Sequence, residues 1–156
     1  MENRILVAFD DSDNAMRAVE YIAKHFATDS KITLFNIAQD TAALCDMNSP
    51  ELTPYFKSQQ SSFCSLEEKK KSLVDSALQT AREKLIAAGF EDKNVTIKVE
   101  TKKKGVARDI AKEAESGYIT IVLGRRGQSG FKDFILGSVS HKVFQLVKDI
   151  SVLVVN

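Results

Sequence analysis

The stretch YITIVLGRRGQSGFKDFILGSVSHKVFQLV, residues 118–147, holds the features that decide the fold of this chain. It begins with a short apolar run typical of a buried strand and ends with apolar residues at helical spacing. Between them lie Gly124, Gly127, Gly130 and Gly137, four of the seven glycines in the chain. Glycine lets a backbone adopt positive φ or approach a neighbour more closely than a Cβ permits. The stretch therefore predicts a strand, a tightly curved connection and a helix.

Five short segments of the chain are rich in β-branched or aromatic residues, which is typical of strands. They are residues 5–9, 32–37, 95–99, 118–123 and 152–155. The first and fourth are nearly continuous apolar runs, as in central strands, whereas residues 95–99 alternate like an edge strand.

Four apolar stripes at helical spacing separate these strands. The stripes are Ala15, Ala18, Val19, Ile22 and Phe26; Leu66, Leu73, Ala77, Ala81 and Leu85; Val106, Ile110 and Ala114; and Val139, Val143, Leu146 and Val147. Ser12 or Asp13 can cap the first helix, Gly89 can end the second, and Ser138 can cap the fourth.

The alternation of strands and helices predicts a parallel sheet with helices on both faces, because parallel neighbours need right-handed crossovers. We expect one Rossmann-like, three-layer α/β domain over residues 1–156, with strand order 3-2-1-4-5 and four helices. Residues 39–65 hold both prolines and show no clear periodicity. They are expected to form a variable insertion, either a lid over a ligand or a surface segment with a short helical turn.

Charge and composition limit the partners of the chain. Its 22 basic and 21 acidic residues nearly balance, which argues against general binding to nucleic acid or membranes. The N-terminus shows no secretion signal, and no apolar run approaches the ~18 residues of a membrane span, so a cytoplasmic protein is expected. Neither Cys45 nor Cys64 belongs to a C-x-x-C pair, so we expect neither a disulfide framework nor a zinc site.

A sheet of this order opens a crevice where the connections after the first and fourth strands diverge to opposite faces. FDDSD, residues 9–13, leaves the first strand, and the glycine-rich stretch leaves the fourth. The helix after Gly137 offers unpaired N–H groups and a partial positive charge, which favour an anion such as a phosphate. The spacing G-x-x-G-x9-G-S matches neither a Walker loop nor a dinucleotide fingerprint. By themselves the glycines fit a structural turn better than a ligand site. Asp10 can cap the first helix, but its place beside the glycine-rich stretch favours a ligand contact.

The chain resembles the universal stress proteins. GRRGQSGFKDFILGS, residues 124–138, matches that family's G-x-x-G-x9-G-[ST] pattern. ILVAFDDSDNAMRAVEYI, residues 5–22, resembles its usual opening, and SVLVV, residues 151–155, resembles its last strand. The likeness spans the chain in order, apart from the insertion.

This resemblance implies binding of ATP, or of AMP or ADP, with or without Mg²⁺ held through the phosphates. Carried over by position, the nucleotide-binding residues are Ala8, Phe9, Asp10, Asn36, Leu123, Gly124, Arg125, Gly127, Gly137, Ser138, Val139 and Ser140. Asp10 is expected at the base and ribose end, and Asn36 beside the adenine through its backbone. The phosphates are expected at the glycines and at the start of the last helix.

The last strand is expected at the edge of the sheet, where its backbone needs a cover. Its residues are Val152, Leu153, Val154 and Val155. The resemblance implies a homodimer through this strand; shielding by the fourth helix is the alternative.

Turnover of a nucleotide has less support in the sequence than binding. Hydrolysis of ATP needs a metal and a positioned water, but no acidic residue is clearly assigned to a metal. Asp10 and His141 are the only candidate bases, so we expect at most weak ATP hydrolysis. The chain is therefore interpreted as a nucleotide-responsive stress dimer with an unidentified protein partner. The alternative is a stress-related dimer that binds no nucleotide.

Overall fold

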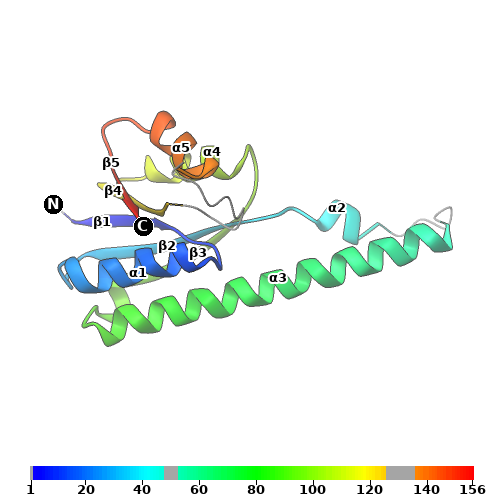
Figure 1. The fold of residues 1–156 in the computed structure, drawn as a ribbon, viewed down its shortest axis with the longest axis horizontal. Helices are drawn as coiled ribbons and strands as arrows, with labels where there is room; N and C mark the ends of the chain where they lie inside the picture. Colours follow the sequence, from blue (N-terminus) through cyan, green and yellow to red (C-terminus); the bar gives the residue numbers. More distant parts are fainter. Residues whose placement is uncertain (1, 48–52, 126–135) are drawn as a thin grey trace.

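The computed structural model describes residues 2–47, 53–125 and 136–156, which form a five-stranded parallel sheet with helices on both faces (Figure 1). The strands are β1 (Arg4–Ala8), β2 (Lys31–Ala38), β3 (Val95–Thr101), β4 (Thr120–Gly124) and β5 (Ser151–Val155). Their order is β3-β2-β1-β4-β5, and all four pairings are parallel. The predicted fold class and strand order are confirmed.

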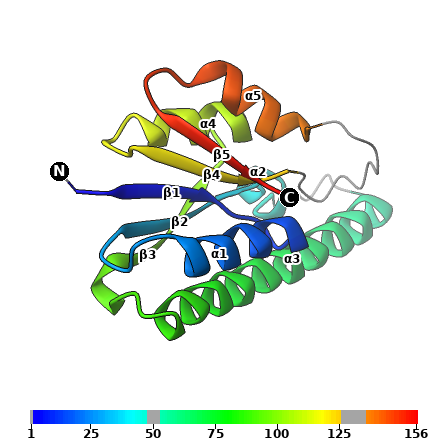
Figure 2. The same ribbon diagram turned by 60° about the vertical axis from the view of Figure 1, so that its left-hand side comes forward.

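Two helices cover each face of the sheet (Figure 2). Helices α1 (Asp13–His25) and α3 (Pro54–Ala87) lie on one face, and α4 (Val106–Ala114) and α5 (Ser138–Leu146) lie on the other. A short helix, α2 (Ala42–Cys45), lies beyond the sheet (Figure 1), in the segment 39–65 for which a short helical turn was one of the two expectations. A 3-10 turn, Asp92–Asn94, leads into β3. No helix in the described part of the chain is long and apolar enough to span a membrane.

Alternate residues of β1 divide the core into two halves, because successive side chains of a strand point to opposite faces. Ile5 and Val7 pack with α1 and α3, whereas Leu6 packs with α4 and α5. All three are almost completely buried, as expected for the central strand of a doubly covered sheet.

The ends of the helices largely follow the capping residues. The Ser12 hydroxyl accepts a hydrogen bond of 3.2 Å from the Ala15 N–H at the start of α1. Gly89, just after α3, has φ of +106°, a conformation that favours glycine. The prediction that Ser138 caps the last helix is wrong by one position: Gly137 is the cap and Ser138 is the first helical residue.

The stripe predicted for α3 is wrong in its first half. Leu66 and Leu73 are 58% and 60% exposed, whereas Leu78, Ala81 and Leu85 face the core. At 3.6 residues per turn, Leu73 lies roughly 120° around the helix axis from Leu85.

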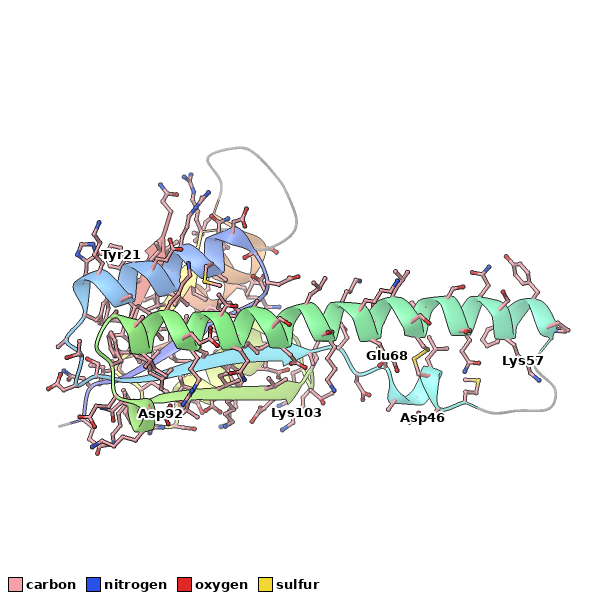
Figure 3. The ribbon with its side chains drawn as sticks, turned by 90° about the horizontal axis from the view of Figure 1, so that it is seen from below. Tyr21, Asp46, Lys57, Glu68, Asp92 and Lys103 are labelled. Carbon is pink, nitrogen blue, oxygen red and sulfur yellow. A yellow bond between two sulfur atoms is a disulfide. The ribbon has the colours of Figure 1, made fainter. Side chains whose placement is uncertain are left out.

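Helix α3 extends well past the end of the sheet, as seen from below in Figure 3. Its 34 residues span about 51 Å, about twice the length of an eight-residue strand such as β2. Much of the predicted insertion at 39–65 is therefore regular helix. We call α2 together with residues 54–66 of α3 the arm.

The arm contains a disulfide bond between Cys45 of α2 and Cys64 of α3. The expectation that these cysteines do not pair is wrong. Their Cα atoms are 5.9 Å apart, although 19 positions separate them in the sequence. Helix α3 packs alongside α2 and so brings Cys64 next to Cys45. The spacings of short cysteine motifs do not reveal such a contact.

Candidate functional site

A pocket of about 300 Å³ opens at the carboxyl ends of β1, β2 and β4, where the sheet order predicts a crevice. Nine of the twelve predicted binding residues line it: Ala8, Phe9, Asp10, Asn36, Leu123, Gly124, Ser138, Val139 and Ser140. Arg125 and Gly137 are not among its described lining residues, and Gly127 lies outside the described part of the chain. Three distant segments of the sequence thus meet at one cavity.

Asp10 supplies the only charge among the described residues that line this pocket. One oxygen of its carboxylate accepts a hydrogen bond of 2.9 Å from the Ser12 N–H, which fixes the turn between β1 and α1. A carboxylate has two oxygens, each with two lone pairs, so Asp10 keeps the capacity to accept hydrogen bonds from a ligand. The role in the turn and a role in binding are therefore compatible.

Asn36 is a buried polar residue near the end of β2. Its side-chain amide donates a hydrogen bond of 2.8 Å to the Phe9 carbonyl, and the Phe9 N–H donates to the Phe35 carbonyl at 2.8 Å. These two bonds continue the pairing of β1 and β2 beyond the ladder itself. The side chain of Asn36 therefore holds the wall of the pocket in place.

Hydrogen bonds also fix the start of α5 at the end of β4. The buried Ser140 hydroxyl donates to the Gly124 carbonyl at 2.8 Å. The Gly137 N–H donates to the Arg125 carbonyl, and the Arg125 N–H donates to the Val155 carbonyl, both at 2.8 Å. The N–H groups in the first turn of a helix have no partner within it, and Ser138, Val139 and Ser140 of this turn line the pocket.

Gly124 is a glycine for a reason that the sequence does not reveal. A Cβ at this position would lie 2.8 Å from the carbonyl carbon and 2.8 Å from the Cβ of Asn14 in α1. The side chain is therefore excluded by the close approach of α1, which is sufficient to explain this glycine without a ligand.

The family model of the universal stress proteins matches residues 1–156. The chain belongs to the universal stress protein family. It is 33% identical over 147 residues to the universal stress protein YxiE of Bacillus subtilis, with 94% of each chain covered.

Solved structures of universal stress proteins share this fold. UspA from Lactobacillus plantarum has a TM-score of 0.70 at 19% identity, covering 100% of this chain and 99% of its own. A universal stress protein described in complex with cAMP has a TM-score of 0.62 at 19% identity, covering 99% of this chain and 97% of its own.

In this universal stress protein, sequence reasoning missed several residues of the pocket wall. They are Ser12, Ala15, Phe35, Ile37, Val106 and Ile110. Val106 and Ile110 were assigned to the core stripe of α4, and nothing in a helical period shows that the first turns of this helix reach the open end of the sheet. The pocket consequently has a more apolar wall than the motif residues alone suggest.

A second pocket of about 320 Å³ adjoins the first and shares Asp10, Asn36 and Ile37 with it. One side is formed by residues that continue β2 toward α2, including Gln39 and Thr41. The other side is formed by α3 residues, namely Glu67, Lys70, Lys71, Val74 and Asp75. Asp11, next to the predicted binding residue Asp10, lines this second pocket.

Neither a metal cluster nor a candidate base other than Asp10 is found at the described site. In the ranges 2–47, 53–125 and 136–156, no three His, Cys, Asp or Glu side chains are grouped in a way that could hold a metal ion. His141, a candidate base, is exposed in α5 and is absent from the lining of both pockets.

Proposed function

We propose that this universal stress protein binds an adenine nucleotide, ATP or AMP or ADP, in the pocket between β1 and β4. The observation that carries the proposal is the meeting of β1, β2 and α5 residues around one cavity of about 300 Å³. That volume lies at the lower end of the range for small-molecule sites. The cAMP complex of a structural neighbour supports a nucleotide as the ligand class.

The lining of the pocket offers groups that suit each part of a nucleotide. Ile37, Val106 and Ile110 offer apolar surface for a base. Asp10 can accept hydrogen bonds from ribose hydroxyls, with the strength of a charge-assisted bond. Ser138 and Val139 begin α5, where free N–H groups and the helix dipole favour phosphate, with or without Mg²⁺.

The protein further acts, in this proposal, as a homodimer whose surface responds to nucleotide. Support comes from β5, which lies at an edge of the sheet and, within the described residues, pairs only with β4. Val152, Leu153 and Val154 are only partly buried there. The β5 strand of a second copy of the chain, related by a two-fold axis, can form hydrogen bonds with the unpaired backbone groups of this edge.

A direct test begins with mass spectrometry of any nucleotide released when the purified protein is denatured. Calorimetry with ATP, AMP and inorganic phosphate then measures affinity. We expect dissociation constants well below millimolar for an adenine nucleotide and weaker binding of phosphate alone. Absence of any adenine nucleotide binding below millimolar concentration overturns the proposal and favours the alternative, a stress-related dimer that works through protein contacts only.

A pair of variants tests the assignment of Asp10. Asp10→Asn keeps an oxygen that can accept from the Ser12 N–H but removes the charge offered to the ribose. We expect roughly a tenfold to hundredfold loss of nucleotide affinity, as for a hydrogen bond to a charged group. Asp13→Asn is the matched control, because Asp13 is exposed at the start of α1 and outside the pocket lining. Equal affinities of the two variants reject the role of Asp10.

A further inference from the structure

Within the arm, a few contacts hold α2 to α3. Helix α2 packs on α3, and Gln60 of α3 donates hydrogen bonds of 2.6 Å and 2.9 Å to the Leu44 and Met47 carbonyls. The Cys45–Cys64 disulfide lies in the same contact, close to Asp46 and Glu68 in Figure 3. These interactions hold α2 against a part of α3 that extends beyond the sheet (Figure 3).

The disulfide joins the outer ends of the two walls of the second pocket. Cys45 follows Thr41 by four residues, and Thr41 lines that pocket from the β2 side. Cys64 precedes Glu67 by three residues, and Glu67 lines the same pocket from α3. The second pocket shares Asp10 with the first. The separation of the walls is therefore coupled to the sulfur–sulfur bond.

The disulfide lies outside the packed core. Cys45 and Cys64 are each only partly buried, and neither belongs to the two apolar clusters of the core. Reduction of the bond is therefore expected to leave the core packing unchanged. Disulfides that solvent can reach are typically labile or regulatory, whereas structural ones resist reduction.

We propose that Cys45 and Cys64 are a reversible thiol–disulfide exchange site that sets the opening of the second pocket. In reduction, the thiolate of a low-molecular-weight thiol attacks one sulfur, the protein S–S bond breaks, and a mixed disulfide and one protein thiolate form. A second small thiolate attacks the small-molecule sulfur of the mixed disulfide and releases the second protein thiolate. Two small thiols become one small disulfide, and the protein takes up two electrons and two protons. Oxidation by a low-molecular-weight disulfide is the reverse.

The consequence of reduction is local. The bond closes a loop between positions 19 apart, and loss of such a cross-link shifts the equilibrium between attached and detached α2 on the order of a hundredfold. Gln60 remains as the main polar link between the two helices. The reduced arm thus opens far more often, while the sheet and its two cores stay folded. This inference does not depend on which ligand enters the first pocket.

The experiment combines thiol counting with amide hydrogen exchange on the full-length protein. The protein is equilibrated in mixtures of reduced and oxidised glutathione, free thiols are alkylated, and the mass reports the fraction with the bond. We expect both thiols to appear and disappear together and reversibly within one chain. Exchange in residues 38–47 and 54–66 is expected to rise roughly tenfold or more on reduction, with β1 and β4 unchanged.

Two variants complete the test. The Cys45→Ser, Cys64→Ser double variant should show the fast exchange of the reduced protein in every mixture. Ser65→Ala, an exposed neighbour on the same helix, should retain the redox response. Equal exchange in the oxidised and reduced protein overturns the proposal. So does a pair that stays as thiols in excess oxidised glutathione, or a bond that forms between two chains.

Discussion

The backbone of Asn14 occupies the space that a side chain on residue 124 would need. The position of a Cβ on Gly124 lies 2.8 Å from the Asn14 carbonyl carbon and 2.9 Å from its carbonyl oxygen. Helix α1 can therefore approach the end of β4 only because residue 124 is glycine. The same approach places Asp10 and Ser12, which precede α1, beside the pocket.

Gly124→Ala is expected to destabilise the fold. The added methyl must displace backbone atoms, and overpacking of this kind costs about 1–3 kcal/mol. Urea unfolding followed by circular dichroism measures the change. Asn14→Gly in the same chain should give little rescue, because it removes the Asn14 Cβ but leaves the carbonyl group in the way. A Gly124→Ala protein as stable as the wild type shows that α1 moves without cost.

This contact marks the limit of sequence reasoning about the glycine-rich stretch. The predicted strand order, with the glycine-rich stretch after the fourth strand, placed Gly124 and Ser138 at the same edge of the sheet as Asp10, where the pocket lies. The G-x-x-G-x9-G-S spacing did not separate a glycine needed by a ligand from one needed by a neighbouring helix. That distinction depends on a contact between residues 110 positions apart in the chain, which no local pattern encodes.

Asn36→Leu is expected to loosen the junction of β1 and β2. Leucine has a similar size but cannot donate to the Phe9 carbonyl, and loss of a buried partner costs about 1–3 kcal/mol. Asn36→Asp should be worse at neutral pH, because it places a negative charge next to that carbonyl oxygen. Thermal unfolding of the three proteins should rank wild type above Asn36→Leu above Asn36→Asp. The reverse order for the two variants contradicts this explanation.

The apolar pattern of the sequence predicted the strands more accurately than the helices. Runs such as Ile5 to Val7 are apolar on both faces, so their central place in the sheet follows from burial alone. The stripe predicted for α3 is wrong at Leu66 and Leu73 because both are apolar but exposed. Leu66 lies in the arm, where the helix has continued past its sheet and has no core to face. Leu73 lies on the outer side of the helix, away from the side that Leu85 buries.

The start of α4 is expected to lose stability in acid. The Asp109 carboxylate accepts backbone hydrogen bonds from the Lys103 and Lys104 N–H groups at 2.7 Å and 3.1 Å, and these bonds lower its pKa below the usual aspartate value. Because the folded pKa is the lower one, this stabilisation is present above the unfolded pKa and is lost as the pH falls through the folded pKa.

Asp109→Ala tests this pH dependence. The variant should be less stable than wild type at neutral pH, and the gap should close as the pH falls below the usual aspartate range. Urea unfolding at a series of pH values measures it. A gap that stays constant into strong acid shows that the charge of Asp109 contributes nothing.

Val154→Lys is expected to prevent dimerisation through β5. Val152 and Leu153 pack against the two cores, whereas Val154 belongs to neither cluster among the described residues. Its substitution should therefore leave the fold intact while placing a charge at the edge of the sheet, where lysine discourages strand pairing. Light scattering after gel filtration should give the mass of a dimer for the wild type and of a monomer for Val154→Lys.

Leu73→Lys is the control. Leu73 is 60% exposed and belongs to α3 rather than to the edge strand β5, so this variant should remain dimeric. If the Val154→Lys protein keeps the mass of a dimer, the interface lies elsewhere. If the wild-type protein is a monomer, the homodimer is rejected, but the proposed nucleotide pocket is not affected.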